Sequence, residues 1–193
     1  KMQNNYPQSK SEEFLNAFSH ILASAYFAYL AYESLHIVAI LYGAIFSSMF
    51  FASFLYHAET PWKSSFRLLD QFFIYIVIGA SGILIPDALS MFQVTLFITF
   101  LALTFIHHLS RWILNVPEGF VIPLLYFGNG ALSGYFLIAE SSQLTTFLWL
   151  GLGGYLVGFL FYLSDHIKYF HTVWHIMCCL GSYFIYAHLN SLF

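Results

Sequence analysis

Long runs of apolar residues, separated by short polar segments, make up most of the chain. Strands of an outer-membrane barrel would instead show about ten residues of alternating apolar and polar positions. Unbroken apolar runs of this length predict α-helices that cross a membrane, each needing about 20 residues. The polar interruptions predict seven such helices, at about 14–32, 36–57, 69–86, 89–107, 120–138, 145–163 and 170–189.

Composition supports a membrane protein. Of the 193 residues, 60% are hydrophobic and only 8% are charged, whereas a soluble domain carries about 25% charged residues. The deficit excludes a cytosolic enzyme, a nucleic-acid binder and a disordered chain. We therefore expect an all-α integral membrane protein with a cytoplasmic segment (1–13), one seven-helix domain (14–189) and a short tail (190–193).

The basic residues predict how the helices are oriented. With seven spans, all six Lys and Arg residues fall on one side of the membrane, while the opposite loops carry only acidic charges. Because basic residues collect on the cytoplasmic side, the N-terminus is expected in the cytoplasm and the C-terminus outside. The basic set is Lys1, Lys10, Lys63, Arg67, Arg111 and Lys168, and the acidic set is Glu33, Asp87 and Glu140.

The positions of the lysines and cysteines argue against a retinal protein and against disulfide or CxxC chemistry. A retinal protein needs a lysine inside its last helix, and Lys168 precedes that helix. Cys178 and Cys179 are adjacent within an apolar run, so they provide neither a disulfide framework nor a CxxC site.

Several polar residues are expected inside the membrane, where ionisable groups are costly and mark functional sites. In the predicted topology they all lie toward the cytoplasmic ends of four helices. These residues are His20, Ser53, His57, Asp70, His171 and His175.

Their spacing indicates a metal site. His171 and His175 are four residues apart, so both imidazoles project from one face of a helix and can bind one ion, as in HExxH motifs, although the glutamate of HExxH is missing. Imidazole suits Zn, Cu, Fe or Ni, and three histidines with an open position are typical of catalytic zinc. Bis-histidine haem is the main alternative, but it would leave a third histidine and Asp70 unexplained.

Four motifs carry a family resemblance. In chain order they are ExxNxxSH at residues 13–20, SxxxH at 53–57, FRxLD at 66–70 and FHxxWH at 170–175. Together they resemble the bacterial hemolysin III proteins, the prokaryotic branch of the progestin and adipoQ receptor family, which is related to the alkaline ceramidases. The resemblance extends from about Glu13 to His188. Many bacterial members carry Glu where this chain has Thr172, which is not a ligand position.

The resemblance implies a buried zinc ion near the inner leaflet of a bacterial cell membrane. Its ligands would be His57, His171 and His175, with Ser53 and Asp70 lining the site. Glu13, Asn16 and His20 match the first motif and would support the ligands or tether helices.

Three functions follow as expectations. The first is a zinc-dependent hydrolase of a ceramide-like lipid amide, with Asp70 as general base and Ser53 binding the oxyanion. The second is a non-enzymatic sensor, homeostasis factor or cytolytic factor with a structural zinc and a lipid or fatty-acid ligand. The third, a pore or transporter, lacks a line of polar residues across the membrane. The substrate and the oligomeric state stay open.

Overall fold

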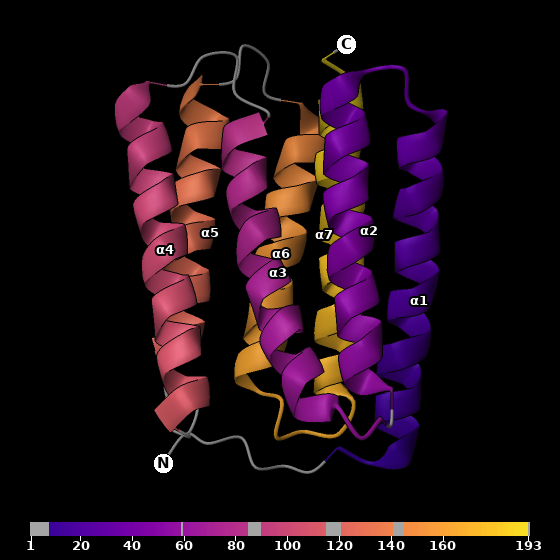
Figure 1. Cartoon of the computed structure of the whole chain (residues 1–193). Helices are drawn as coiled ribbons and strands as arrows, with labels where there is room; N and C mark the ends of the chain where they lie inside the picture. Colours follow the sequence, from indigo (N-terminus) through magenta and orange to yellow (C-terminus); the bar gives the residue numbers. More distant parts are fainter. Residues whose placement is uncertain (1–7, 59, 85–89, 115–120, 141–144, 193) are drawn as a thin grey trace. The chain divides into compact units, whose positions relative to one another are not determined.

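The fold is that of a computed structural model, which describes residues 8–58, 60–84, 90–114, 121–140 and 145–192. Within these residues the chain forms helices and no strand (Figure 1). The seven helices are α1 (Lys10–Glu33), α2 (Ile37–His57), α3 (Lys63–Leu84), α4 (Met91–Leu114), α5 (Val121–Glu140), α6 (Thr146–Leu163) and α7 (Phe170–Asn190). Each of the seven predicted segments therefore contains a helix within the described residues.

Helix α3 begins earlier than the apolar pattern indicates. It starts at Lys63 rather than near residue 69, so Lys63 and Arg67 lie in its first turns and not in a preceding loop. The reason is that hydropathy detects only the apolar part of a helix, whereas polar residues can continue the helix into the interface. Asp70 consequently lies two turns inside α3 instead of at its start. Lys1, Asp87 and the side chain of Glu140 lie outside the described residues.

Four helices in the described part of the chain are long and apolar enough to cross a membrane. They are α1, α2, α6 and, in α4, the segment Val94–Arg111. These apolar helices indicate a membrane protein.

The helices form two compact units. One contains residues 71–142, with most of α3 and all of α4 and α5; the other contains residues 4–70 and 143–193, with α1, α2, the start of α3, α6 and α7. In the first unit, Tyr75 packs against Ile122 and Tyr126, and the Asn129 side-chain amide donates to the Tyr75 carbonyl at 3.3 Å. The second unit contains all the site residues predicted above.

Helices α1 and α7 run parallel, in register, through the second unit. The Thr172 hydroxyl donates to Asn16 Oδ1 at 2.6 Å, and the Tyr186 hydroxyl donates to the Leu30 carbonyl at 2.9 Å. Residues 16 and 30 of α1 thus face residues 172 and 186 of α7, with the same offset. This register brings the beginnings of the two helices together.

Helices α6 and α7 approach closely at glycines. A Cβ added at Gly158 would lie 2.9 Å from Met177 Cβ, and one at Gly154 would lie 3.3 Å from Gly181 Cα. The Gly154xxxGly158 pattern therefore faces α7, as small residues at membrane helix contacts do.

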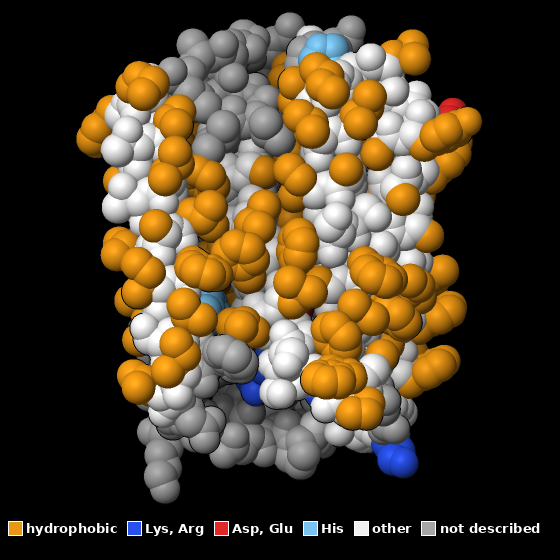
Figure 2. Space-filling model, viewed as in Figure 1, with side chains coloured by type: hydrophobic (Ala, Val, Ile, Leu, Met, Phe, Trp, Pro, Cys, Tyr) orange, Lys and Arg blue, Asp and Glu red, His pale blue; other side chains and the backbone are white. Residues whose placement is uncertain are grey.

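Large apolar side chains cover the outside of the second unit. Figure 2 shows hydrophobic side chains along α1 and α2, and the exposed residues of these helices include Phe14, Leu22 and Phe51. Such a surface matches contact with lipid rather than with water.

Candidate metal centre

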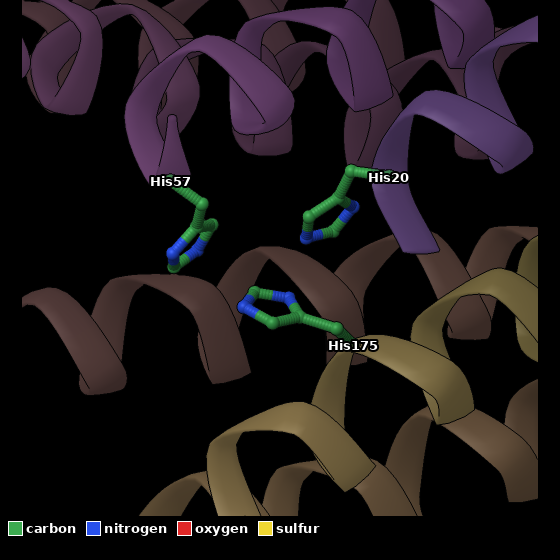
Figure 3. A group of neighbouring side chains, drawn as sticks. All are labelled: His20, His57 and His175. Atoms are coloured by element: carbon green, nitrogen blue, oxygen red, sulfur yellow. The ribbon is translucent and has the colours of Figure 1, made fainter. Parts of the chain in front are cut away.

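Three histidines from three helices converge inside the second unit. His20 of α1, His57 of α2 and His175 of α7 are all buried, and each offers a ring nitrogen within 4.8 Å of those of the other two. Figure 3 shows their imidazoles pointing toward one another. The ring centroid of His175 lies 4.2 Å from that of His20 and 4.8 Å from that of His57.

Four of the six ring nitrogens of these three histidines are buried and lack hydrogen-bond partners among the described residues. They are Nε2 of His57, Nε2 of His175 and both ring nitrogens of His20. A buried polar atom without a partner costs about 1–3 kcal/mol, and the cost is higher within a bilayer. A metal ion would satisfy several of these atoms at once.

The other nitrogen of His57 is held by a carboxylate. Glu13 Oε2 lies 2.8 Å from His57 Nδ1, and Glu13 Oε1 accepts from Lys63 Nζ. Metal-binding histidines almost always use their second nitrogen in this way, because the carboxylate fixes the tautomer and the ring orientation. Glu13 therefore occupies Nδ1 and leaves Nε2 of His57 available to a metal ion.

His171 lies beside the three converging histidines. Its ring centroid is 4.4 Å from that of His175 and 5.7 Å from that of His57. Its Nδ1 is 3.8 Å from Asp165 Oδ2, which is too long for a hydrogen bond. Four histidines thus gather at this end of the unit, and the predicted ligand set of His57, His171 and His175 stays a prediction.

Two contacts fix the start of α7 against α1. Besides the bond between Asn16 and Thr172, Glu12 Oε1 accepts from the Tyr169 backbone amide at 2.7 Å. Tyr169 has φ = 67°, a conformation that few non-glycine residues adopt. The Glu12 carboxylate stabilises this conformation by accepting a hydrogen bond from the Tyr169 amide. Helix α7 begins at the next residue, Phe170.

The two predicted catalytic residues are buried in the same unit. Ser53 lies one turn before His57 on α2 and is 2% exposed, and Asp70 of α3 is 6% exposed. Their roles stay predictions.

Sequence reasoning missed two supporting residues. Glu12 was detectable, because Ser9 and Glu12 form the capping box that starts α1. Lys63 was assigned only to topology, since a sequence gives no sign that it meets Glu13 across 50 positions. His20 was expected to support the site, and the structure places it among the converging rings.

The donor set fits a metal ion. Nitrogens bound to one zinc at about 2.0–2.1 Å lie about 3.4 Å apart in tetrahedral geometry, so modest side-chain rotation would bring the present nitrogens into range. Comparisons of the chain with protein-family models, curated proteins and solved structures find no match. The geometry of the histidines therefore carries the functional argument.

Proposed function

We propose that this protein is a zinc-dependent hydrolase that cleaves a ceramide-like lipid amide in the inner leaflet of a bacterial cell membrane. In this proposal it has seven membrane spans, a cytoplasmic N-terminus and membership of the hemolysin III branch suggested by its motifs. The observation that carries the proposal is the convergence of buried histidine nitrogens without hydrogen-bond partners.

Zinc is the metal that this donor set favours in a hydrolase. Neutral imidazoles are good ligands for zinc, and three of them leave a position open for water or substrate. When bound, zinc polarises a carbonyl and lowers the pKa of water, which is the chemistry that amide hydrolysis requires. His57 and His175 would bind it, and either His20 or His171 would complete the set.

The chain supplies two further groups. Asp70 would accept the proton from the water that attacks the amide carbon, and would pass it to the leaving amine. The Ser53 hydroxyl would donate a hydrogen bond to the carbonyl oxygen as negative charge develops there. Both side chains are buried, so a site that contains them would exclude bulk water.

The depth of the cluster favours a lipid substrate. In the second unit the basic residues Lys10, Lys63 and Lys168 belong to the same end as the histidines, while Glu33 ends α1 at the other end. With the basic end in the cytoplasm, the histidines would lie beneath the inner headgroups, where the linkages of membrane lipids are found.

Turnover of lipid amides by the detergent-purified protein tests the proposal. We expect the wild-type protein to hydrolyse ceramide-like substrates and Asp70→Ala to lose activity while it retains metal. A neighbouring substitution on the same helix, Gln71→Ala, serves as the control. Equal rates for wild type and Asp70→Ala across a panel of lipid amides, with metal retained in both, would contradict the proposed hydrolase function.

A second candidate is a non-enzymatic membrane sensor or cytolytic factor with a structural metal. It is favoured by the origin of the converging histidines on α1, α2 and α7, since one ion would link three helices. This function predicts that chelation lowers the thermal midpoint steeply while no lipid amide is turned over. Metal-dependent turnover would exclude it.

A further inference from the structure

A shallow apolar groove follows the contact between α1 and α7. Its volume is about 270 Å³, and it is lined by Ala23, Tyr26, Phe27, Cys179, Leu180 and Tyr183. Ala23 and Phe27 are buried and form its floor, whereas Tyr26, Leu180 and Tyr183 are 44%, 43% and 39% exposed. The groove therefore opens sideways, on the outer surface of the helix pair.

The groove begins one turn beyond the histidine cluster on both helices. Ala23 follows His20 by one turn on α1, and Cys179 follows His175 by one turn on α7. Because the two helices are parallel and in register, both sides of the groove continue in the same direction from the histidines, by about 5 Å for each turn. An elongated ligand with its polar group at the histidines would extend along the groove.

The lining and the size suit one hydrocarbon chain. The described lining has no charged side chain, and its volume is below the roughly 300–1,000 Å³ of sites that enclose a whole small molecule. Since α1 is long and apolar enough to cross the membrane, the open side of the groove faces lipid tails. A headgroup at the other end would meet exposed Lys10 and Lys168, which begin α1 and precede α7.

From this arrangement we infer that the groove binds the acyl chain of the lipid whose polar linkage lies at the histidines. The inference rests on the proposed function, because it takes the histidines as the place of the reacting group. It makes Ala23 a specificity residue, since its small side chain leaves the floor of the groove open. The rings of Tyr26 and Tyr183, whose centroids lie 6.1 Å apart, would line one side of the acyl chain rather than enclose it.

Photo-crosslinking tests the inference without relying on turnover. The wild-type protein, reconstituted in phospholipid nanodiscs, is irradiated with a ceramide analogue that carries a diazirine in the middle of its acyl chain, and the adducts are mapped by mass spectrometry. We expect adducts on the segments of α1 and α7 that line the groove. Competition by unlabelled ceramide, but not by added phosphatidylglycerol, separates a substrate chain from bulk lipid.

Two substitutions fill the groove. Ala23→Phe should lower this crosslinking by about ten-fold, since losing contact with two methylene groups already has an effect of that size. Ala28→Phe, on an exposed position of α1 outside the lining, is the matched control and should leave crosslinking unchanged. Leu180→Trp narrows the groove from its exposed side and replaces Ala23→Phe if that variant does not fold.

The outcomes separate the groove from the proposed reaction. Adducts on the residues of the groove without any turnover would support acyl-chain binding there and contradict the proposed hydrolase function. Turnover with adducts on other helices would contradict acyl-chain binding in the groove, but not the hydrolase function. Competition by phosphatidylglycerol as effective as that by ceramide would also contradict that binding, because the occupant would then be bulk lipid.

Discussion

The imidazoles of His57 and His175 belong to both ligand sets that the cluster allows, whereas the third position falls to His20 or His171. His20 has two buried nitrogens without hydrogen-bond partners, while His171 shares the face of α7 with His175. Substitution of the residue that ligates the metal should weaken binding by more than the 10- to 100-fold typical of supporting residues. We expect His57→Ala and His175→Ala to lose the metal.

Measuring the metal content and the metal affinity of His20→Ala and His171→Ala shows which of these two histidines is the third ligand. The larger loss identifies it, and His188→Ala, at the far end of α7, is the control that should keep the metal. Undiminished affinity in both His57→Ala and His175→Ala would contradict the site itself.

Glu13 should control affinity without touching the metal. Glu13→Gln removes the charge that pairs with His57 Nδ1, so we expect the zinc affinity to fall by about 10- to 100-fold, measured by competition with a chelator. Lys63→Met keeps the carboxylate and removes the competing cation, so its affinity should not fall. An unchanged affinity in Glu13→Gln would show that the carboxylate does not support His57.

At the scale of helices, the contact between α6 and α7 depends on Gly158. Its hydrogen faces Met177 Cβ and the Trp174 ring, where an added Cβ would lie at 2.9 and 3.1 Å. Gly158→Val should therefore push the helices apart and lower the free energy of unfolding by about 1–3 kcal/mol, as overpacking does. The measurement is the thermal midpoint in detergent.

Gly153→Val provides the control on the same helix. A Cβ at Gly153 meets nothing within 4 Å, yet the change of helix propensity is the same as at Gly158. Equal thermal midpoints for the two variants would mean that the close approach at Gly158 does not stabilise the pair.

The positions of the helices were largely predictable, because each contains an apolar run bounded by polar residues. The predicted and observed bounds of α6 and α7 differ by one residue or less at each end. The two larger errors are at the start of α3 and at the end of α4, which reaches Leu114 instead of about residue 107, so that Arg111 is helical. Both arise because polar residues continue a helix beyond its apolar run. Lys63 and Arg67 are helical although they are polar, and hydropathy alone cannot distinguish such an interfacial turn from a loop.

The site was predictable in its residue types but not in its pairings. Helical spacing places His171 and His175 on one face, since that relation is local. The contact between His20 and His175 spans 155 positions, and it depends on the parallel register of α1 and α7. That register is set by long-range bonds such as the one from Thr172 to Asn16, which a single sequence does not reveal.

At the scale of the molecule, the histidine cluster and three basic residues of the second unit lie at the same ends of their helices. Lys10 begins α1, Lys63 begins α3 and Lys168 precedes α7, and these are the ends at which the histidines gather. Under the proposed function, the orientation of the protein would determine which leaflet supplies the lipid substrate. A cytoplasmic basic end would give the site lipids of the inner leaflet, and the reverse orientation would give it lipids of the outer one.

Cysteine labelling measures this orientation. In a background with Cys178→Ala and Cys179→Ala, single cysteines are introduced as Glu33→Cys and Lys168→Cys, both at exposed positions. Because basic residues are retained on the cytoplasmic side, a membrane-impermeant maleimide should label intact cells at position 33, and at position 168 only after permeabilisation. The reverse pattern would place the histidines beneath the headgroups of the outer leaflet. It would contradict the proposal that the substrate is a lipid of the inner leaflet. Labelling of both positions in intact cells would contradict the single orientation on which the proposed function depends.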